Sequence, residues 1–208
     1  MEVGPRLPTD APPFLPQPAP ARRRCPRAFG RPFEKGAQLI AATLGVLKAG
    51  KFFVLLDPSF PKARITAMFQ DSNADLLISA RKDAPLAREV ASNECRLMEF
   101  ESTQADISAE NLRLVVSPKA LAVIFYTSGS TGKPKGVVQN HRNLLHNMML
   151  RTNASQVCVH DRITLLPSGT ANSVTNSFLA LLNGAALLPY NVQKEGVAGL
   201  TGWLSQER

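Results

Sequence analysis

The sequence predicts an α/β fold in which helices pack on a mostly parallel β-sheet. Short apolar runs that are rich in strand-forming residues alternate with longer segments whose apolar residues recur at helical spacing. Turns that contain glycine or proline separate the two kinds of segment. The chain has 208 residues, of which 44% are hydrophobic and 19% charged, so it can bury one sizeable core and has the composition of an ordinary globular protein.

The first half of the folded region contains three helix and strand pairs. Ile40, Leu44 and Leu47 recur on one helical face, and Gly50 then provides a stop. The run FFVLL at 52–56 is apolar and rich in strand formers. In chain order we expect a helix at 36–50, a strand at 52–56, a helix at 61–72, a strand at 76–79, a helix around 83–92, a strand around 96–100 and a loop over 101–118.

The second half begins with LAVIFYT at 121–127, the most strand-like run in the chain. It leads into a segment of glycines and hydroxyl residues, and extended structure resumes at 137–139. Asn140 is placed to cap a helix over 141–153. The apolar residues of that helix are Leu144, Leu145, Met148 and Met149. We then expect a strand at 163–166, a helix at 173–184, a strand at 185–190 and a final helix from 197.

Positive charge is concentrated at the start of the chain. The formal net charge is +8. Residues 1–35 contain seven basic and three acidic residues, so this stretch carries half of the net positive charge. The same stretch contains nine of the sixteen prolines, so it cannot bury enough apolar surface to offset the entropy of ordering. We therefore predict a disordered Pro/Arg-rich tail over 1–35 and a folded unit over 36–208. A targeting or nucleic-acid patch at RRRCPR and a polyproline ligand at PPFLPQPAP are the alternatives for the tail.

Several classes of protein are disfavoured. No apolar run approaches the roughly 18 residues that a membrane span needs, so we expect no membrane partner. The basic residues lack interleaved aromatic residues, which argues against nucleic acid as a partner. Three cysteines and three histidines show neither disulfide nor metal-ligand spacing, so we expect no metal site built from them and a reducing, cytoplasmic location.

The segment 127–136 combines three kinds of group that bind anions. Glycines let the backbone N–H groups turn into one hollow, hydroxyls donate hydrogen bonds, and lysines supply charge suited to a polyphosphate. These residues are Thr127, Ser128, Gly129, Ser130, Thr131, Gly132, Lys133, Lys135 and Gly136. The common nucleotide loop needs Ser or Thr after its Gly-Lys pair, and Pro134 stands there instead. Composition alone leaves a solvated hairpin turn as the alternative.

Three segments resemble motifs of the adenylate-forming superfamily, which includes acyl-CoA synthetases, luciferases and the adenylation domains of nonribosomal peptide synthetases. YTSGSTGKPKGVV at 126–138 resembles the phosphate-binding signature. LGVLKAGKFFVLLDPSFPKARI at 44–65 resembles a segment typical of the peptide-synthetase branch, and SVTNSFLALLNGA at 173–185 is similar to the helix beside the acyl-substrate pocket. The resemblance covers roughly 34–208, so it implies a partial N-terminal subdomain of an AMP-binding (adenylation) enzyme.

The resemblance implies ATP-dependent activation of a carboxylic acid. The carboxylate would attack the α-phosphate of ATP to give an acyl adenylate and pyrophosphate, and the acyl group would then pass to a thiol of CoA or of carrier-protein phosphopantetheine. Residues 127–136 would hold the β and γ phosphates, with Lys133 and Lys135 neutralising the departing pyrophosphate. Mg²⁺ would offset the remaining phosphate charge.

By the same resemblance, Ala171, Asn172 and Ser173 would line the acid pocket. Relatives that activate amino acids carry, at the position of Ala171, an aspartate that pairs with the substrate's α-amine. Alanine cannot bind an ammonium group, and a cation left without a partner in a partly buried pocket is strongly destabilised. We therefore expect an acid without a free α-amine, such as an aryl, hydroxy or fatty acid.

The resemblance also places the adenine, ribose and magnesium motifs and the catalytic lysine beyond Arg208. We therefore expect an incomplete domain whose catalytic residues are unknown. The expected behaviour of these 208 residues alone is no acid-dependent ATP–pyrophosphate exchange. The alternative function is a non-catalytic nucleotide-binding or interaction module.

Overall fold

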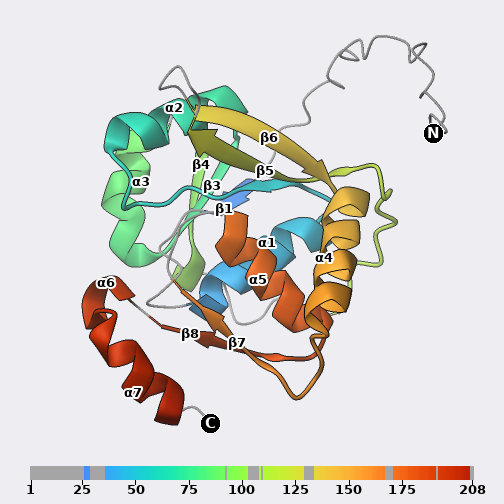
Figure 1. Ribbon diagram of the computed structural model, residues 1–208. Helices are drawn as coiled ribbons and strands as arrows, with labels where there is room; N and C mark the ends of the chain where they lie inside the picture. The colour runs from blue at the N-terminus through green and yellow to red at the C-terminus, as the bar shows by residue number, and fades with distance from the viewer. Residues whose placement is uncertain are drawn as a thin grey trace, which may run out of the picture.

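The computed structural model describes residues 26–28, 36–91, 93–102, 108, 110–128, 134–166, 171–190 and 192–206. Helices cover both faces of the strands (Figure 1). The elements of the first half are β1 (Pro26–Ala28), α1 (Gly36–Lys48), β2 (Phe53–Val54), α2 (Lys62–Ser72), β3 (Leu76–Ser79), the 3₁₀ helix η1 (Arg81–Asp83), α3 (Ala84–Val90), β4 (Arg96–Glu99) and η2 (Phe100–Ser102). Those of the second half are β5 (Leu121–Ser128), β6 (Pro134–Asn140), α4 (His141–Ser155), β7 (Arg162–Leu165), α5 (Ala171–Leu182), β8 (Ala186–Pro189), α6 (Val192–Glu195) and α7 (Ala198–Gln206).

The strands form three small sheets, and most of their pairings are parallel. The orders are β1-β3-β4, β2-β5-β6 and β7-β8. Among the described strands, only β5 and β6 pair antiparallel. The predicted α/β class with a mostly parallel sheet is therefore confirmed. Within the described residues, no helix is long and apolar enough to cross a membrane.

Strand β1 departs from the tail predicted over 1–35. Its three residues pair in parallel with Leu76, Leu77 and Ile78 of β3. A parallel neighbour supplies backbone hydrogen bonds to a segment whose own composition shows no strand pattern, which is why the sequence did not indicate it. The rest of the predicted tail lies outside the described residues.

The short strand β2 is buried on both faces. Successive side chains alternate between two hydrophobic clusters, with Phe53 and Leu55 in the first and Val54 and Leu56 in the second. Phe53, Val54 and Leu56 are fully buried, and burying each such side chain contributes roughly 1.5–3 kcal/mol. Burial on both faces explains why the predicted strand is an unbroken apolar run rather than an alternating one.

The two clusters lie on opposite faces of the sheet. The first packs β2 and β5 against α1, α4 and α5, and the second packs them against α2 and α3. In Figure 1, α4 and α5 lie beside each other below the β5–β6 hairpin, whereas α2 and α3 lie at the other side of the strands. The β5–β6 hairpin therefore leaves the core at the place where the two hydrophobic clusters meet.

Helix α1 buries most deeply two residues, Thr43 and Val46, that lie beside the face formed by Ile40, Leu44 and Leu47. Thr43 and Val46 are buried, whereas Leu44 is 37% exposed. The Thr43 hydroxyl donates to the carbonyl oxygens of Leu39 and Ile40 at 3.0 and 2.9 Å, so its burial leaves no unsatisfied donor. A hydroxyl that bonds within its own helix can therefore occupy an apolar interface.

Helix α4 begins where the sequence predicts. The Asn140 side chain accepts a hydrogen bond from the backbone N–H of Asn143 at 2.7 Å, which caps the helix. Among its apolar residues, Leu144 and Met148 are buried, but Leu145, Met149 and Leu150 are about half exposed. The helix thus buries a narrow stripe against the first cluster.

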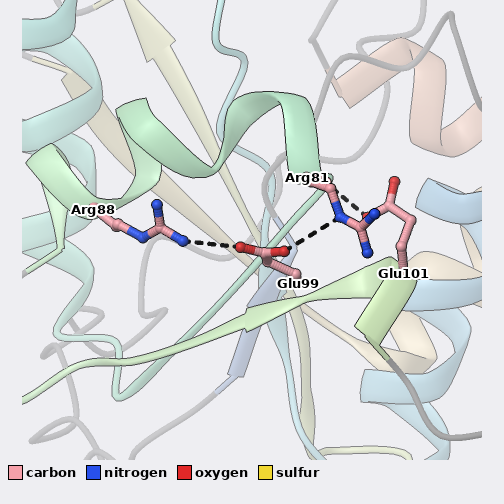
Figure 2. A network of polar contacts seen from close by, with 4 residues as sticks. All are labelled: Arg81, Arg88, Glu99 and Glu101. Atoms are coloured by element: carbon pink, nitrogen blue, oxygen red, sulfur yellow. Dashed lines mark hydrogen bonds and ion pairs between the residues drawn. The ribbon is translucent and has the colours of Figure 1, made fainter.

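A network of four charged residues joins η1 and α3 to the end of β4 (Figure 2). The Glu99 carboxylate lies between Arg88, whose Nη2 is 3.0 Å away, and Arg81, whose Nε is 3.7 Å away. The backbone N–H of Arg81 donates to Glu101 at 2.9 Å. Both arginine side chains are mainly exposed, so the network contributes little stability and mainly orients these segments.

Adjacent leucines of α4 provide a test of this packing. Leu144→Ala removes a side chain that is 7% exposed and belongs to the first cluster, and it is expected to lower the free energy of unfolding by about 2–5 kcal/mol. Leu145→Ala changes a side chain that is 53% exposed and is expected to alter it by less than about 0.5 kcal/mol. Urea unfolding followed by circular dichroism measures both, and equal losses would contradict the burial of α4.

Candidate functional site

The segment predicted to bind phosphate connects the two strands of an antiparallel hairpin. Tyr126 stands opposite Gly136, Thr127 opposite Lys135, and Ser128 opposite Pro134. Residues 129–133 join the two strands, so the predicted site residues Gly129, Ser130, Thr131, Gly132 and Lys133 lie outside the described residues. The second strand begins at Pro134 rather than at the predicted 137, because the pairing continues up to this connection.

Thr127 and Lys135 are the predicted site residues whose side chains the structure describes at the end of the hairpin. Both are exposed, and the Thr127 hydroxyl donates to the backbone carbonyl of Lys135 at 3.5 Å. Directly opposite residues of an antiparallel pair project from the same face. A hydroxyl and an ammonium group therefore stand side by side in solvent, a combination suited to an anion.

Gly136 packs closely against the opposite strand of the hairpin. A Cβ atom added there would lie 3.0 Å from Ile124 Cγ2 and 3.4 Å from the ring of Tyr126. The tyrosine ring thus lies across the opposite strand in the space that a larger residue would fill. The structure gives this glycine a steric role, alongside the phosphate-binding role that the sequence predicts.

The Tyr126 side chain also connects the hairpin to α2. Its hydroxyl donates to Asp71 Oδ2 at 2.5 Å, and its ring packs against the second hydrophobic cluster. Asp71 was not among the predicted site residues. It lies 55 residues before Tyr126, and an aspartate in the last turn of a helix gives no sequence signal for such a contact.

The three predicted pocket residues lie in the first turn of α5. The side chains of Ala171 and Asn172 lie outside the described residues. Ser173 is 3% exposed, and its carbonyl accepts the Ser177 hydroxyl at 2.8 Å. Ser173 and Ser177 face Thr43 of α1 across a cavity of about 10 Å³, which is room for one water molecule. The described part of α5 therefore brings Ser173 to α1 rather than to the hairpin.

The ionisable side chains described near the end of the hairpin include Lys135, Asp71 and His141. His141, which follows β6, is partly buried, and loss of hydration lowers the pKa of its imidazole. It is therefore neutral at pH 7. The described residues contain no group of three or more His, Cys, Asp or Glu side chains that could hold a metal ion.

The chain matches known proteins across the hairpin and α5. The family model described as AMP-binding enzyme matches residues 33–199. Nonribosomal peptide synthetase sidD of Aspergillus fumigatus is 38% identical over 160 residues, which are 74% of this chain and 8% of that protein. The complex of VinN with L-aspartate has a TM-score of 0.67 at 25% identity, covering 80% of this chain and 44% of that one.

A further solved structure supports the fold alone. McyG A-PCP complexed with phenylalanyl-adenylate has a TM-score of 0.73 at 15% identity, covering 88% of this chain and 31% of that one. The chain spans 2% to 14% of the length of the curated relatives that it matches. Since the family model covers most of this sequence, the chain belongs to the AMP-binding enzyme family.

Proposed function

We propose that the β5–β6 hairpin binds the triphosphate of ATP, and that the chain is part of an enzyme that activates a carboxylic acid as an acyl adenylate. The observation that carries this proposal is the pairing of Thr127 with Lys135. It sets a hydroxyl and an ammonium group on one exposed face, at the two ends of the segment SGSTGKP. Membership of the AMP-binding family supports the nucleotide as the ligand.

The roles of the hairpin residues follow from their chemistry. The Lys135 ammonium group would neutralise charge on the β and γ phosphates. The Thr127 hydroxyl would exchange its hydrogen bond to the Lys135 carbonyl for one to a phosphate oxygen. Ser128 and the connecting residues Gly129, Ser130, Thr131, Gly132 and Lys133 would contribute amide, hydroxyl and ammonium donors. Bound ATP supplies the α-phosphate that the carboxylate attacks and the pyrophosphate that leaves. Donors fixed around a leaving group stabilise the charge that develops on it.

Magnesium is part of the proposal because a triphosphate carries more negative charge than Lys133 and Lys135 together offset. Mg²⁺ commonly keeps several waters and is bound largely through substrate phosphates. The described residues contain no carboxylate cluster of their own, so the phosphate oxygens would supply the principal contacts.

The proposed acceptor of the acyl group is a thiol, on carrier-protein phosphopantetheine or on CoA. The likeness to a nonribosomal peptide synthetase supports the carrier protein. We also propose a cytoplasmic location, because the three cysteines of the sequence show no disulfide spacing.

For the acid, we propose a substrate without a free α-amine. Ala171 begins α5 and has no charge with which to pair an ammonium group. A buried cation without a partner is costly, whereas a hydroxyl or aryl group needs no counter-ion. L-Aspartate bound to VinN makes amino acids the alternative that must be compared directly.

Two exposed lysines near the ends of β5 allow a matched test of nucleotide binding. Lys135→Ala is expected to weaken ATP binding by about tenfold or more, because hydrogen bonds to charged groups contribute roughly 1.5–3 kcal/mol. Lys119 lies just before β5, at the end of the hairpin remote from Thr127, so Lys119→Ala should leave the affinity unchanged. Isothermal titration calorimetry measures both. Equal affinities for the two variants would count against the hairpin as the triphosphate site.

A second test uses pairs of acids that differ only in the α-substituent. ATP–pyrophosphate exchange is measured in a complete adenylation enzyme that carries this segment, with each α-hydroxy acid compared with its α-amino counterpart. The hydroxy acid is expected to support exchange and the amino acid to be at least tenfold poorer. Ala171→Asp should improve KM for the amino acid. Exchange with the amino acids alone would refute the proposed substrate class.

A further inference from the structure

The end of the β5–β6 hairpin extends past its neighbouring strand. Strand β2 pairs with β5 at Val123 and Ile124, whereas the β5–β6 ladder continues to Ser128. Strand β6 lies at the edge of this sheet as described. A two-stranded ribbon is only marginally stable and twists strongly, so the paired ends that carry Thr127 and Lys135 need support from outside the sheet.

Helix α2 provides a rigid support at this place. Ile65, Met68 and Phe69 are buried in the second cluster, and the helix ends in a left-handed cap at Asn73. Asp71 is in its last turn and accepts the Tyr126 hydroxyl at 2.5 Å. The hairpin is thus tied to a helix that packing holds in place.

The hydrogen bond between Tyr126 and Asp71, which we call the tether, acts on both strands of the hairpin. Tyr126 belongs to β5, and its ring lies 3.4 Å from the position of a Cβ on Gly136 of β6. Packing of an aromatic ring across a glycine on the opposite strand stabilises such a pair. Thr127 and Lys135 are the next residues along the two strands, so a rotation of the ribbon at Tyr126 would move both of them.

We infer that Tyr126 and Asp71 are positioning residues, which fix the direction in which Thr127 and Lys135 face the triphosphate. This inference rests on the proposed function, because positioning Thr127 and Lys135 matters for binding only if the hairpin binds phosphate. Neither residue is required to touch the nucleotide. Their contribution is to restrict the ribbon to the orientation that binds, which avoids the cost of ordering it on binding.

The experiment is a double-mutant cycle on the full chain, with affinity for ATP and for inorganic tripolyphosphate measured by calorimetry. Tyr126→Phe keeps the ring and removes the hydroxyl, and Asp71→Ala removes the acceptor. Each is expected to weaken binding about threefold to tenfold. The double variant should bind no more weakly than the weaker single variant, because both changes remove one interaction. Asp71→Asn keeps an acceptor oxygen and should lose less.

Lys62→Met is the matched control on the same helix. It removes the exposed contact of 2.6 Å between Lys62 and Glu89, so it changes the surface of α2 without reaching the hairpin. Its affinity should equal that of the unmodified chain, and urea unfolding gives the stability of every variant. A loss of affinity in Lys62→Met as large as that in Asp71→Ala would mean that α2 acts only through general stability, which overturns the inference.

The remaining outcomes separate this inference from the proposed function. If Lys135→Ala weakens binding but Tyr126→Phe and Asp71→Ala do not, the tether has no positioning role and the proposed function stands. Additive losses in the double variant would also overturn the inference, since the two residues would then act separately. If the unmodified chain binds neither ATP nor tripolyphosphate, both proposals fail.

Discussion

The alternation of side chains along β5 is the constraint on which the site depends. Val123 and Phe125 pack against the first cluster, whereas Ile124 and Tyr126 pack against the second. Because each face of the strand is committed to a different set of helices, β5 can neither slide by one residue nor rotate without exchanging its two faces. The point at which the hairpin leaves the core, and the face that carries Thr127 and Lys135, are therefore set by burial several residues earlier.

Much of this arrangement could be predicted from the sequence, because its causes are local. The unbroken apolar run of β5, the capping side chain of Asn140 and the apolar residues of α2 all indicate their structures within a few positions. The anion-binding site stays a prediction, and it is based on the glycine, hydroxyl and lysine residues of one short segment. The features that the sequence did not predict depend on contacts between residues far apart in the chain. Strand β1 is defined only by its pairing with β3.

The hydrophobic spacing of helices also proved an incomplete guide. It placed Leu44 on the apolar face of α1 and included Leu145 among the apolar residues of α4, but both side chains are substantially exposed. In α1 the interface is shared by Thr43, whose hydroxyl is satisfied within the helix, so a polar residue is buried beside the face that apolar spacing indicates. Apolar spacing identifies a helix reliably. Which side of the helix is buried depends on the strands and helices that pack against it.

The position of Asp71 raises an electrostatic question for a hairpin that is proposed to bind a triphosphate, because a carboxylate repels phosphate. The alternation of the strand resolves it. Tyr126 and Gly136 project from one face of the hairpin, and Thr127 and Lys135 from the other. The carboxylate is therefore bound on the face opposite the cationic one, where it is exposed to solvent and where salt screens its field within about 10 Å. An aspartate at this place can thus tether the ribbon through the tyrosine hydroxyl without opposing the ligand, which a carboxylate beside Thr127 could not do.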